Sequence, residues 1–153
     1  MSVVLNTSAV SALTRIDGFD ILEQMFSQII VPGGVLDEFS AKFKSFPQWI
    51  TVEEVKTQCP KNSNLYTLGR GEREAIILAR KLGALLVIED KKARKVCQEL
   101  NLGITGTFGI IRKAFEECFM SRKELETKLE ILKKDLYYEK RLIDWVLKAK
   151  KTR

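Results

Sequence analysis

Short, wholly apolar runs separated by helix-length segments are the feature that most constrains the fold of this chain. The clearest runs cover residues 3–5, 29–31 and 85–88, and a weaker run follows at 103–105. Apolar and polar residues alternate over residues 49–55, which fits an edge strand, and residues 57–68 suit a loop. Strands that are apolar throughout are typical of parallel sheets buried on both faces. The sequence therefore predicts an α/β fold with three α-β-α layers, about five parallel strands and right-handed crossovers.

The length of 153 residues suits one domain with one core. We expect a single domain over residues 1–153. Residues 121–153 should form a C-terminal helical extension packed on or beside it. Ser121 and Glu124 match a capping box at the start of that extension.

Several features of the composition narrow the functional class. No segment reaches the roughly 20 apolar residues of a membrane span, and no leader pattern precedes the first strand, so we expect a cytoplasmic protein without membrane contact. The three cysteines lack any CxxC spacing, which disfavours disulfides and zinc. Cys97 and Cys118 are expected to be reduced and buried in helices. Histidine is absent, which excludes Ser-His-Asp, Cys-His and histidine-ligated zinc sites.

The net charge of +6 is concentrated at the end of the chain, where residues 133–153 hold eight basic and three acidic side chains. A basic helix there favours a polyanion such as RNA. A solvated, lysine-rich terminal helix explains the same charges equally well.

Polar side chains follow each apolar run, where the strands are expected to end. The carboxyl ends of parallel strands share one edge of a sheet. Carboxylates gathered there repel one another unless a cation lies among them, and oxygen ligands without histidine or thiolate select Mg²⁺ or Mn²⁺. Such a site can assist phosphodiester cleavage. The residues concerned are Asn6, Glu38, Glu72, Glu74, Glu89 and Asp90.

Each of these residues also has a simpler interpretation. Glu38 suits a solvated helix surface, and Glu72 suits a helix N-terminus. Asp90 suits an N-cap for the helix that follows it, and Asn6, Thr7 or Ser8 could cap the first helix. Thr105 or Thr107 could likewise cap the helix that follows the last strand. Only their joint placement at successive strand ends favours a metal site.

The segments VVLNTSAVSAL, IIVPGGVLDEF, LGRGEREAIILAR, LLVIEDKKARKVCQELN and ITGTFGIIRKA together resemble a PIN domain over about residues 2–115. The resemblance is to the small prokaryotic PIN proteins related to the VapC toxins. It implies the strand order 3-2-1-4-5 and a Mg²⁺- or Mn²⁺-dependent ribonuclease site. It also implies RNA as substrate, a small antitoxin as a possible partner and a homodimer. The helices expected from Phe19 and Phe108 offer apolar surface for pairing, although burial in the core would use most of that surface.

The resemblance assigns roles to individual residues. The first-strand aspartate of the family falls on Asn6, and the second acid falls on Glu38. The third falls on either Glu72 or Glu74, which the sequence does not separate. The fourth falls on Asp90, with Glu89 as an accessory acid. The supporting hydroxyls are Thr7 or Ser8 after the first strand and Thr105 and Thr107 after the last.

Asn6 is the departure from the family pattern. An amide oxygen is a weaker metal ligand than a carboxylate and cannot act as a base. We expect weaker metal binding and catalysis reduced by roughly 10²-fold or more. Three interpretations remain: natural divergence, a deliberate inactivating substitution, or compensation by Glu89.

The function predicted first is a Mg²⁺- or Mn²⁺-dependent ribonuclease of the PIN/VapC toxin type, attenuated by Asn6. The alternative is a catalytically degenerate PIN domain that binds RNA or a protein. An unrelated doubly wound domain is a third class, but the chain has no nucleotide-binding GxGxxG or GxxxxGK[ST] motif.

Overall fold

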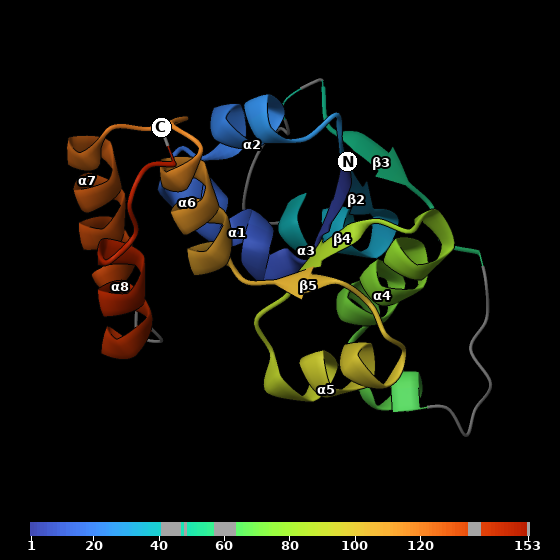
Figure 1. Cartoon of the computed structure of the whole chain (residues 1–153). Helices are drawn as coiled ribbons and strands as arrows, with labels where there is room; N and C mark the ends of the chain where they lie inside the picture. The colour runs from blue at the N-terminus through green and yellow to red at the C-terminus, as the bar shows by residue number, and fades with distance from the viewer. Residues whose placement is uncertain (41–46, 48, 57–63, 135–138, 153) are drawn as a thin grey trace.

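A five-stranded parallel sheet organises the chain and confirms the predicted α/β class and strand order (Figure 1). The computed structural model describes residues 1–40, 47, 49–56, 64–134 and 139–152. In spatial order the sheet runs β3-β2-β1-β4-β5. The strands are β1 (Ser2–Leu5), β2 (Gln28–Pro32), β3 (Thr51–Glu53), β4 (Leu85–Val87) and β5 (Ile104–Thr105).

The central strand β1 is buried on both faces, which explains why its run is wholly apolar. Val4 is paired with Ile30 of β2 and with Leu86 of β4. These three side chains belong to one hydrophobic cluster, whereas Val3 and Leu5 belong to another. Alternate residues of a strand point to opposite faces, so one strand supplies both cores.

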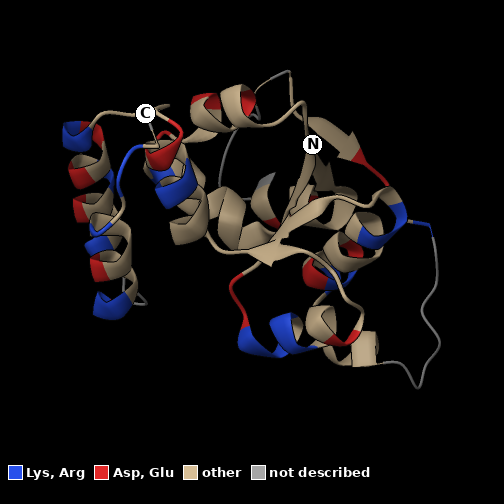
Figure 2. Ribbon diagram, viewed as in Figure 1, with Lys and Arg blue, Asp and Glu red and all other residues tan. Residues whose placement is uncertain are grey.

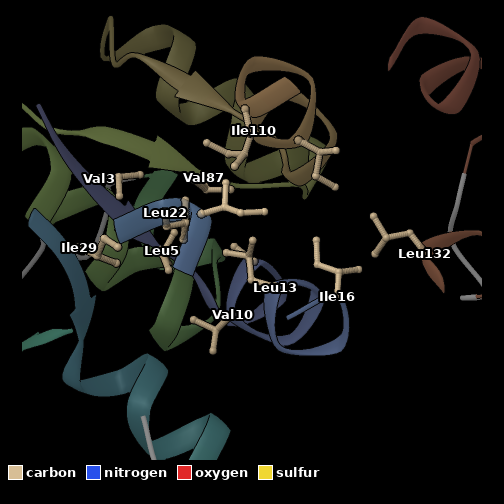
Figure 3. Packing of buried hydrophobic residues seen from close by; sticks show 14 of the residues in the cluster. Val3, Leu5, Val10, Leu13, Ile16, Leu22, Ile29, Val87, Ile110 and Leu132 are labelled. Carbon is tan, nitrogen blue, oxygen red and sulfur yellow. The ribbon is translucent and has the colours of Figure 1, made fainter. Parts of the chain in front are cut away.

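Helices cover both faces of the sheet (Figure 1). Those contributing to the cluster around Val3 and Leu5 are α1 (Thr7–Arg15), α2 (Phe19–Met25), α3 (Gly33–Ser40) and α6 (Thr107–Glu116). The opposite face is covered by α4 (Arg70–Leu82) and α5 (Lys91–Glu99). Figure 3 shows the first cluster, with Leu5 of β1 near Leu13 of α1. No helix among the described residues is long and apolar enough to cross a membrane.

The last two helices add to the first cluster. They are α7 (Arg122–Lys133) and α8 (Lys140–Leu147). Leu125 of α7 and Val146 of α8 are fully buried in that cluster. Ser121 caps α7 as predicted, since its hydroxyl accepts the Glu124 N–H at 3.1 Å. Beyond α8, Thr152 donates its backbone N–H to the Glu116 carbonyl at 2.9 Å, which attaches the end of the described chain to α6.

Three local predictions differ from the structure. The edge strand covers only Thr51–Glu53 of the predicted residues 49–55. Of the loop expected over residues 57–68, positions 57–63 lie outside the described residues and Asn64–Thr67 forms a 3-10 turn. Cys97 is buried as expected, but the prediction for Cys118 is wrong: it is exposed beyond α6. Its φ of 67° is a left-handed conformation, which ends the helix before it.

Truncating Leu86 tests the dependence of the fold on the central strands. Leu86 is fully buried, and its replacement by alanine leaves a cavity. We expect Leu86→Ala to lower the free energy of unfolding by about 2–5 kcal/mol in urea denaturation. Leu82→Ala is the matched control, because Leu82 is 41% exposed at the end of α4 and its loss should cost less than about 0.5 kcal/mol. Equal losses for both variants would contradict this account of the core.

Candidate functional site

Three carboxylates from three separate elements lie at the carboxyl edge of the sheet, where the charges of two of them act on the third. Glu38 lies on α3, Glu72 in the first turn of α4, and Asp90 at the N-cap of α5. The pKa of Glu72 is raised above its ordinary value, chiefly by burial and then by the negative charge of Asp90, with a smaller contribution from Glu38. A hydrogen bond with the backbone of Gly69 partly opposes these effects. The fold therefore brings together side chains that are distant in sequence.

The Glu38 carboxylate is held by donors from two other helices. Thr7 donates its hydroxyl to Oε2 at 2.5 Å, and Gly71 donates its backbone N–H to Oε1 at 3.0 Å. A Cβ atom at Gly71 would lie 2.9 Å from either carboxylate oxygen. The absence of a side chain at Gly71 thus allows Glu38 to approach the start of α4. This arrangement joins α1, α3 and α4 around one acidic group.

Asn6 is buried, with 1% of its surface exposed, and it caps α1. Its side-chain Oδ1 accepts the Ala9 N–H at 2.9 Å. Of the three possible caps Asn6, Thr7 and Ser8, the structure therefore selects Asn6, and the caps at Thr7 and Ser8 are wrong. The physical reason is that the helix begins at Thr7, before the expected start at Ala9, so that Thr7 is already helical while Asn6 keeps an extended conformation. Asparagine and aspartate cap helices about equally well, so the cap explains a polar residue here without requiring an amide.

Glu74 has different surroundings from Glu72. It is only 8% exposed, and both of its carboxylate oxygens are engaged. Oε1 accepts the Gly34 N–H at 2.9 Å, and Oε2 accepts Arg70 Nε at 2.7 Å. Arg70 also reaches Asp37 at 3.0 Å. Glu74 therefore joins α3 to α4, whereas Glu72 is the acid of this pair that faces Asp90.

The two acids after β4 are also used by neighbouring helices. Asp90 caps α5 through Oδ2, which accepts the Ala93 N–H at 2.9 Å. Glu89 accepts the Thr107 N–H at 2.5 Å, and its other oxygen lies 3.9 Å from Arg94. The prediction that Thr105 or Thr107 caps α6 is wrong, because the N-cap is Gly106 and the Glu89 carboxylate satisfies the Thr107 N–H instead. Figure 2 shows the acidic segment directly before the basic start of α5.

A cavity of about 480 Å³ opens beside Glu72, Glu89 and Asp90, and we call it the acidic cavity; Asn6, Glu38 and Glu74 are not among its lining residues. Its polar walls include Ser8, Glu72, Glu89, Asp90 and Thr107. The Thr107 hydroxyl oxygen is buried and has no hydrogen-bond partner within the described part of the chain.

The donors around the acidic cavity suit Mg²⁺ or Mn²⁺, since they are hard oxygens. Within the ranges that the structure describes, no three acidic or cysteine side chains are already grouped closely enough to hold an ion. A metal would therefore have to draw the carboxylates together.

Comparison with known proteins identifies the family. The family model for DUF3368, described as a PIN domain, matches residues 2–152. The chain belongs to the PIN domain family. The PIN domain is in general a nuclease fold that depends on divalent metal ions.

One solved structure adds a distant likeness. It is a PilT N-terminus domain protein, SSO1118, from the hyperthermophilic archaeon Sulfolobus solfataricus P2. The two chains are 18% identical, the match covers 91% of this chain and 99% of the other, and the TM-score is 0.48. No curated protein matches this chain.

The raised pKa of Glu72 predicts how stability depends on pH. The native state keeps a proton on this carboxyl to a higher pH than the unfolded state does, so stability falls as pH rises between the two pKa values. Without metal at pH 7, we expect Glu72→Gln to raise the free energy of unfolding by a few tenths of a kcal/mol, because solvent screens a half-buried group. The gain should vanish below pH 4.5, the ordinary pKa of this group.

Urea denaturation in EDTA at both pH values measures this effect. Glu130→Gln, on the exposed side of α7, is the control and should change stability little at either pH. A destabilised Glu72→Gln variant at pH 7 would show that the Glu72 charge is not under repulsion.

Proposed function

We propose that this PIN domain is a Mg²⁺- or Mn²⁺-dependent ribonuclease of the VapC type whose activity is attenuated by Asn6. The observation that carries the proposal is the convergence of Glu38, Glu72 and Asp90 at one edge of the sheet, where burial and then the charges of Asp90 and Glu38 raise the pKa of Glu72. Repulsion among carboxylates is the condition that a divalent cation relieves. The chemistry of the donors and the family assignment support the same conclusion.

In this proposal Glu72, Asp90 and Glu38 hold the metal, while Glu74 keeps α3 and α4 together. Thr7 and Gly71 orient the Glu38 carboxylate from opposite sides. A bound divalent ion would activate water and stabilise charge on the phosphate. Thr107 also lines the acidic cavity, but its hydroxyl oxygen is buried, so this side chain would have to turn toward the cavity to donate a hydrogen bond to a phosphate oxygen.

Asn6 is the reason for expecting attenuation. It supplies an amide where a fourth carboxylate would add negative charge, and its Oδ1 is already used as a cap. Glu89 could compensate only by leaving the Thr107 N–H and moving away from Arg94. Loss of those contacts opposes compensation, so divergence or an inactivating substitution explains Asn6 better.

The VapC resemblance extends the proposal to partners. RNA is the substrate class, a small antitoxin is a possible regulator, and a second copy of the chain completes a homodimer. The helices that begin near Phe19 and Phe108 were expected to offer apolar surface for pairing. Phe19 instead packs edge-to-face on Trp49, with ring centroids 6.3 Å apart, and Phe108 lines the acidic cavity. The dimer surface therefore needs other residues of these helices.

Asn6→Asp is the direct test of the proposed function. Aspartate preserves the cap on α1 and adds the missing charge, so we expect tighter Mn²⁺ binding and RNA cleavage faster by roughly 10²-fold or more. Calorimetric titration measures the Mn²⁺ affinity, and a fluorescent single-stranded RNA measures the rate of cleavage. Asn101→Asp adds the same charge at an exposed position after α5, and it should change neither the Mn²⁺ affinity nor the cleavage rate. Absence of cleavage and of metal binding in both the unmodified and the Asn6→Asp chains would overturn the nuclease proposal.

Two glycines at the start of α4 give a paired test of the role of Glu38. Alanine at Gly71 would displace the Glu38 carboxylate, whereas alanine at Gly69 meets nothing within 4 Å. In the Asn6→Asp background, we expect Gly71→Ala to weaken Mn²⁺ binding about 10-fold or more, comparable with loss of an orienting group around a metal. Gly69→Ala should leave the affinity unchanged. Equal Mn²⁺ affinities for the two variants would contradict the assignment of Glu38 to the metal site.

A catalytically degenerate, binding-only PIN domain is the second candidate. It is favoured by the buried amide of Asn6 and by the absence, within the described ranges, of a preformed group of three metal ligands. Tight Mn²⁺ binding by the unmodified chain, measured in the same titration, would contradict it.

A further inference from the structure

A second hollow adjoins the acidic cavity and leads away from it. This groove, of about 380 Å³, is lined by residues of α5, α6 and α8. It shares four wall residues with the acidic cavity: Glu89, Phe108, Glu139 and Leu142. Its outer end is formed by Arg141 and Trp145, which also line a third hollow of about 530 Å³ on the surface of α8. The three hollows are therefore contiguous.

The charge of the walls changes along this path. The acidic cavity is lined by four acidic groups and one arginine. The groove holds three basic groups and two acidic ones, and Arg141 is paired with Glu139 at 3.3 Å. In the hollow on α8, Lys140, Arg141 and Lys148 outnumber Asp144. A polyanion could therefore contact the basic side chains of the hollow on α8. It could approach the carboxylates of the acidic cavity only if a metal ion neutralised them.

Trp145 stands at the junction of the groove and the outer hollow. It is 44% exposed, which is unusual for a large apolar side chain. The Arg112 guanidinium lies 4.4 Å from its ring centroid and donates to the Trp145 carbonyl at 3.1 Å. Arg112 is itself fixed by Glu116 at 2.8 Å. The ring is therefore held in place while much of its surface faces solvent.

An exposed aromatic ring beside cations is the combination that binds single-stranded nucleic acid, because a base stacks on the ring while the cations contact phosphates. We propose that the groove and the α8 hollow form a binding subsite for single-stranded RNA. A base stacks on Trp145, and neighbouring phosphates contact Arg141, Lys148 and Lys91. The strand then continues into the acidic cavity, and this last step rests on the proposed nuclease function.

Binding can be measured without cleavage. In a Trp49→Phe background Trp145 is the sole tryptophan, so its fluorescence reports on its own surroundings. Titration with a single-stranded oligouridylate of about eight nucleotides in EDTA should quench it saturably. Anisotropy of a labelled oligonucleotide measures the affinity of variants that lack the tryptophan. We expect Trp145→Ala to weaken RNA binding by roughly 5- to 100-fold and Trp145→Phe to retain most of the affinity.

Matched controls separate stacking from general charge. Tyr66 is also 44% exposed and lies 5.7 Å from an arginine guanidinium, but it lines none of the three hollows. Tyr66→Ala should therefore leave the affinity unchanged. Arg141→Ala should reduce the slope of log affinity against log salt by about 0.7, the value for one phosphate contact on a single strand. Lys123→Ala, at an exposed position on α7, should leave this slope unchanged.

Several outcomes would overturn the subsite. They are an absence of quenching, equal losses for Trp145→Ala and Tyr66→Ala, or equal affinity for duplex RNA, which offers no unstacked base. Thermal unfolding of Trp145→Ala, with Trp145→Phe as the conservative variant, verifies folding. If RNA quenches Trp145 fluorescence but neither the unmodified nor the Asn6→Asp chain cleaves RNA or binds Mn²⁺, the subsite stands and the nuclease proposal fails. If the Asn6→Asp chain cleaves RNA while the Trp145→Ala variant binds RNA with unchanged affinity, the subsite proposal fails and the nuclease proposal stands.

Discussion

Burial of β1 on both faces is the constraint on which the rest of the structure depends. Because β1 pairs in parallel with β2 and β4, all three strands end at the same edge of the sheet. The chain must then leave each strand at that edge and begin a helix there. The polar residues required for those turns and caps are gathered in one place as a result. The candidate site is therefore a consequence of the sheet topology.

The acidic residues at that edge divide into two groups by their hydrogen-bond partners. Glu74 and Glu89 each have both oxygens near donors or cations, so they stabilise the junctions between helices. Glu72 has no such ion pair among the described residues, and its pKa is raised by burial and by the charges of Asp90 and Glu38. A fold that tolerates this repulsion without a metal gives up some stability, which is what an ion-binding site requires. The same division explains why the count of acidic residues alone does not define the ligand set.

Much of the architecture could be predicted because it follows from local pattern. The wholly apolar runs located β1, β2 and β4, and Ser121 located the start of α7. The prediction for Cys118 failed because the end of α6 is set by one left-handed residue, which periodicity does not reveal. The cap of α1 could not be chosen from the sequence for a similar reason: Asn6, Thr7 and Ser8 are all good caps, and the backbone conformation of Asn6 decides among them. The strand order came from resemblance to PIN domains, since spacing alone does not order parallel strands.

The sequence by itself determined the chemical inventory: oxygen donors after the strands, no histidine, an amide at position 6 and a basic C-terminal end. It did not separate Glu72 from Glu74, because both lie in the same helical turn. Tertiary structure decided this, since the partner of Glu74 is Gly34, forty residues away, whereas Glu72 faces Asp90 and Glu38. Tertiary structure alone also placed Trp145, near the end of the chain, in a groove whose walls include Glu89, Lys91 and Arg94 from the middle of the chain. The physical reason is the same in both cases: the environment of a side chain is set by long-range packing, which leaves no local pattern in the sequence.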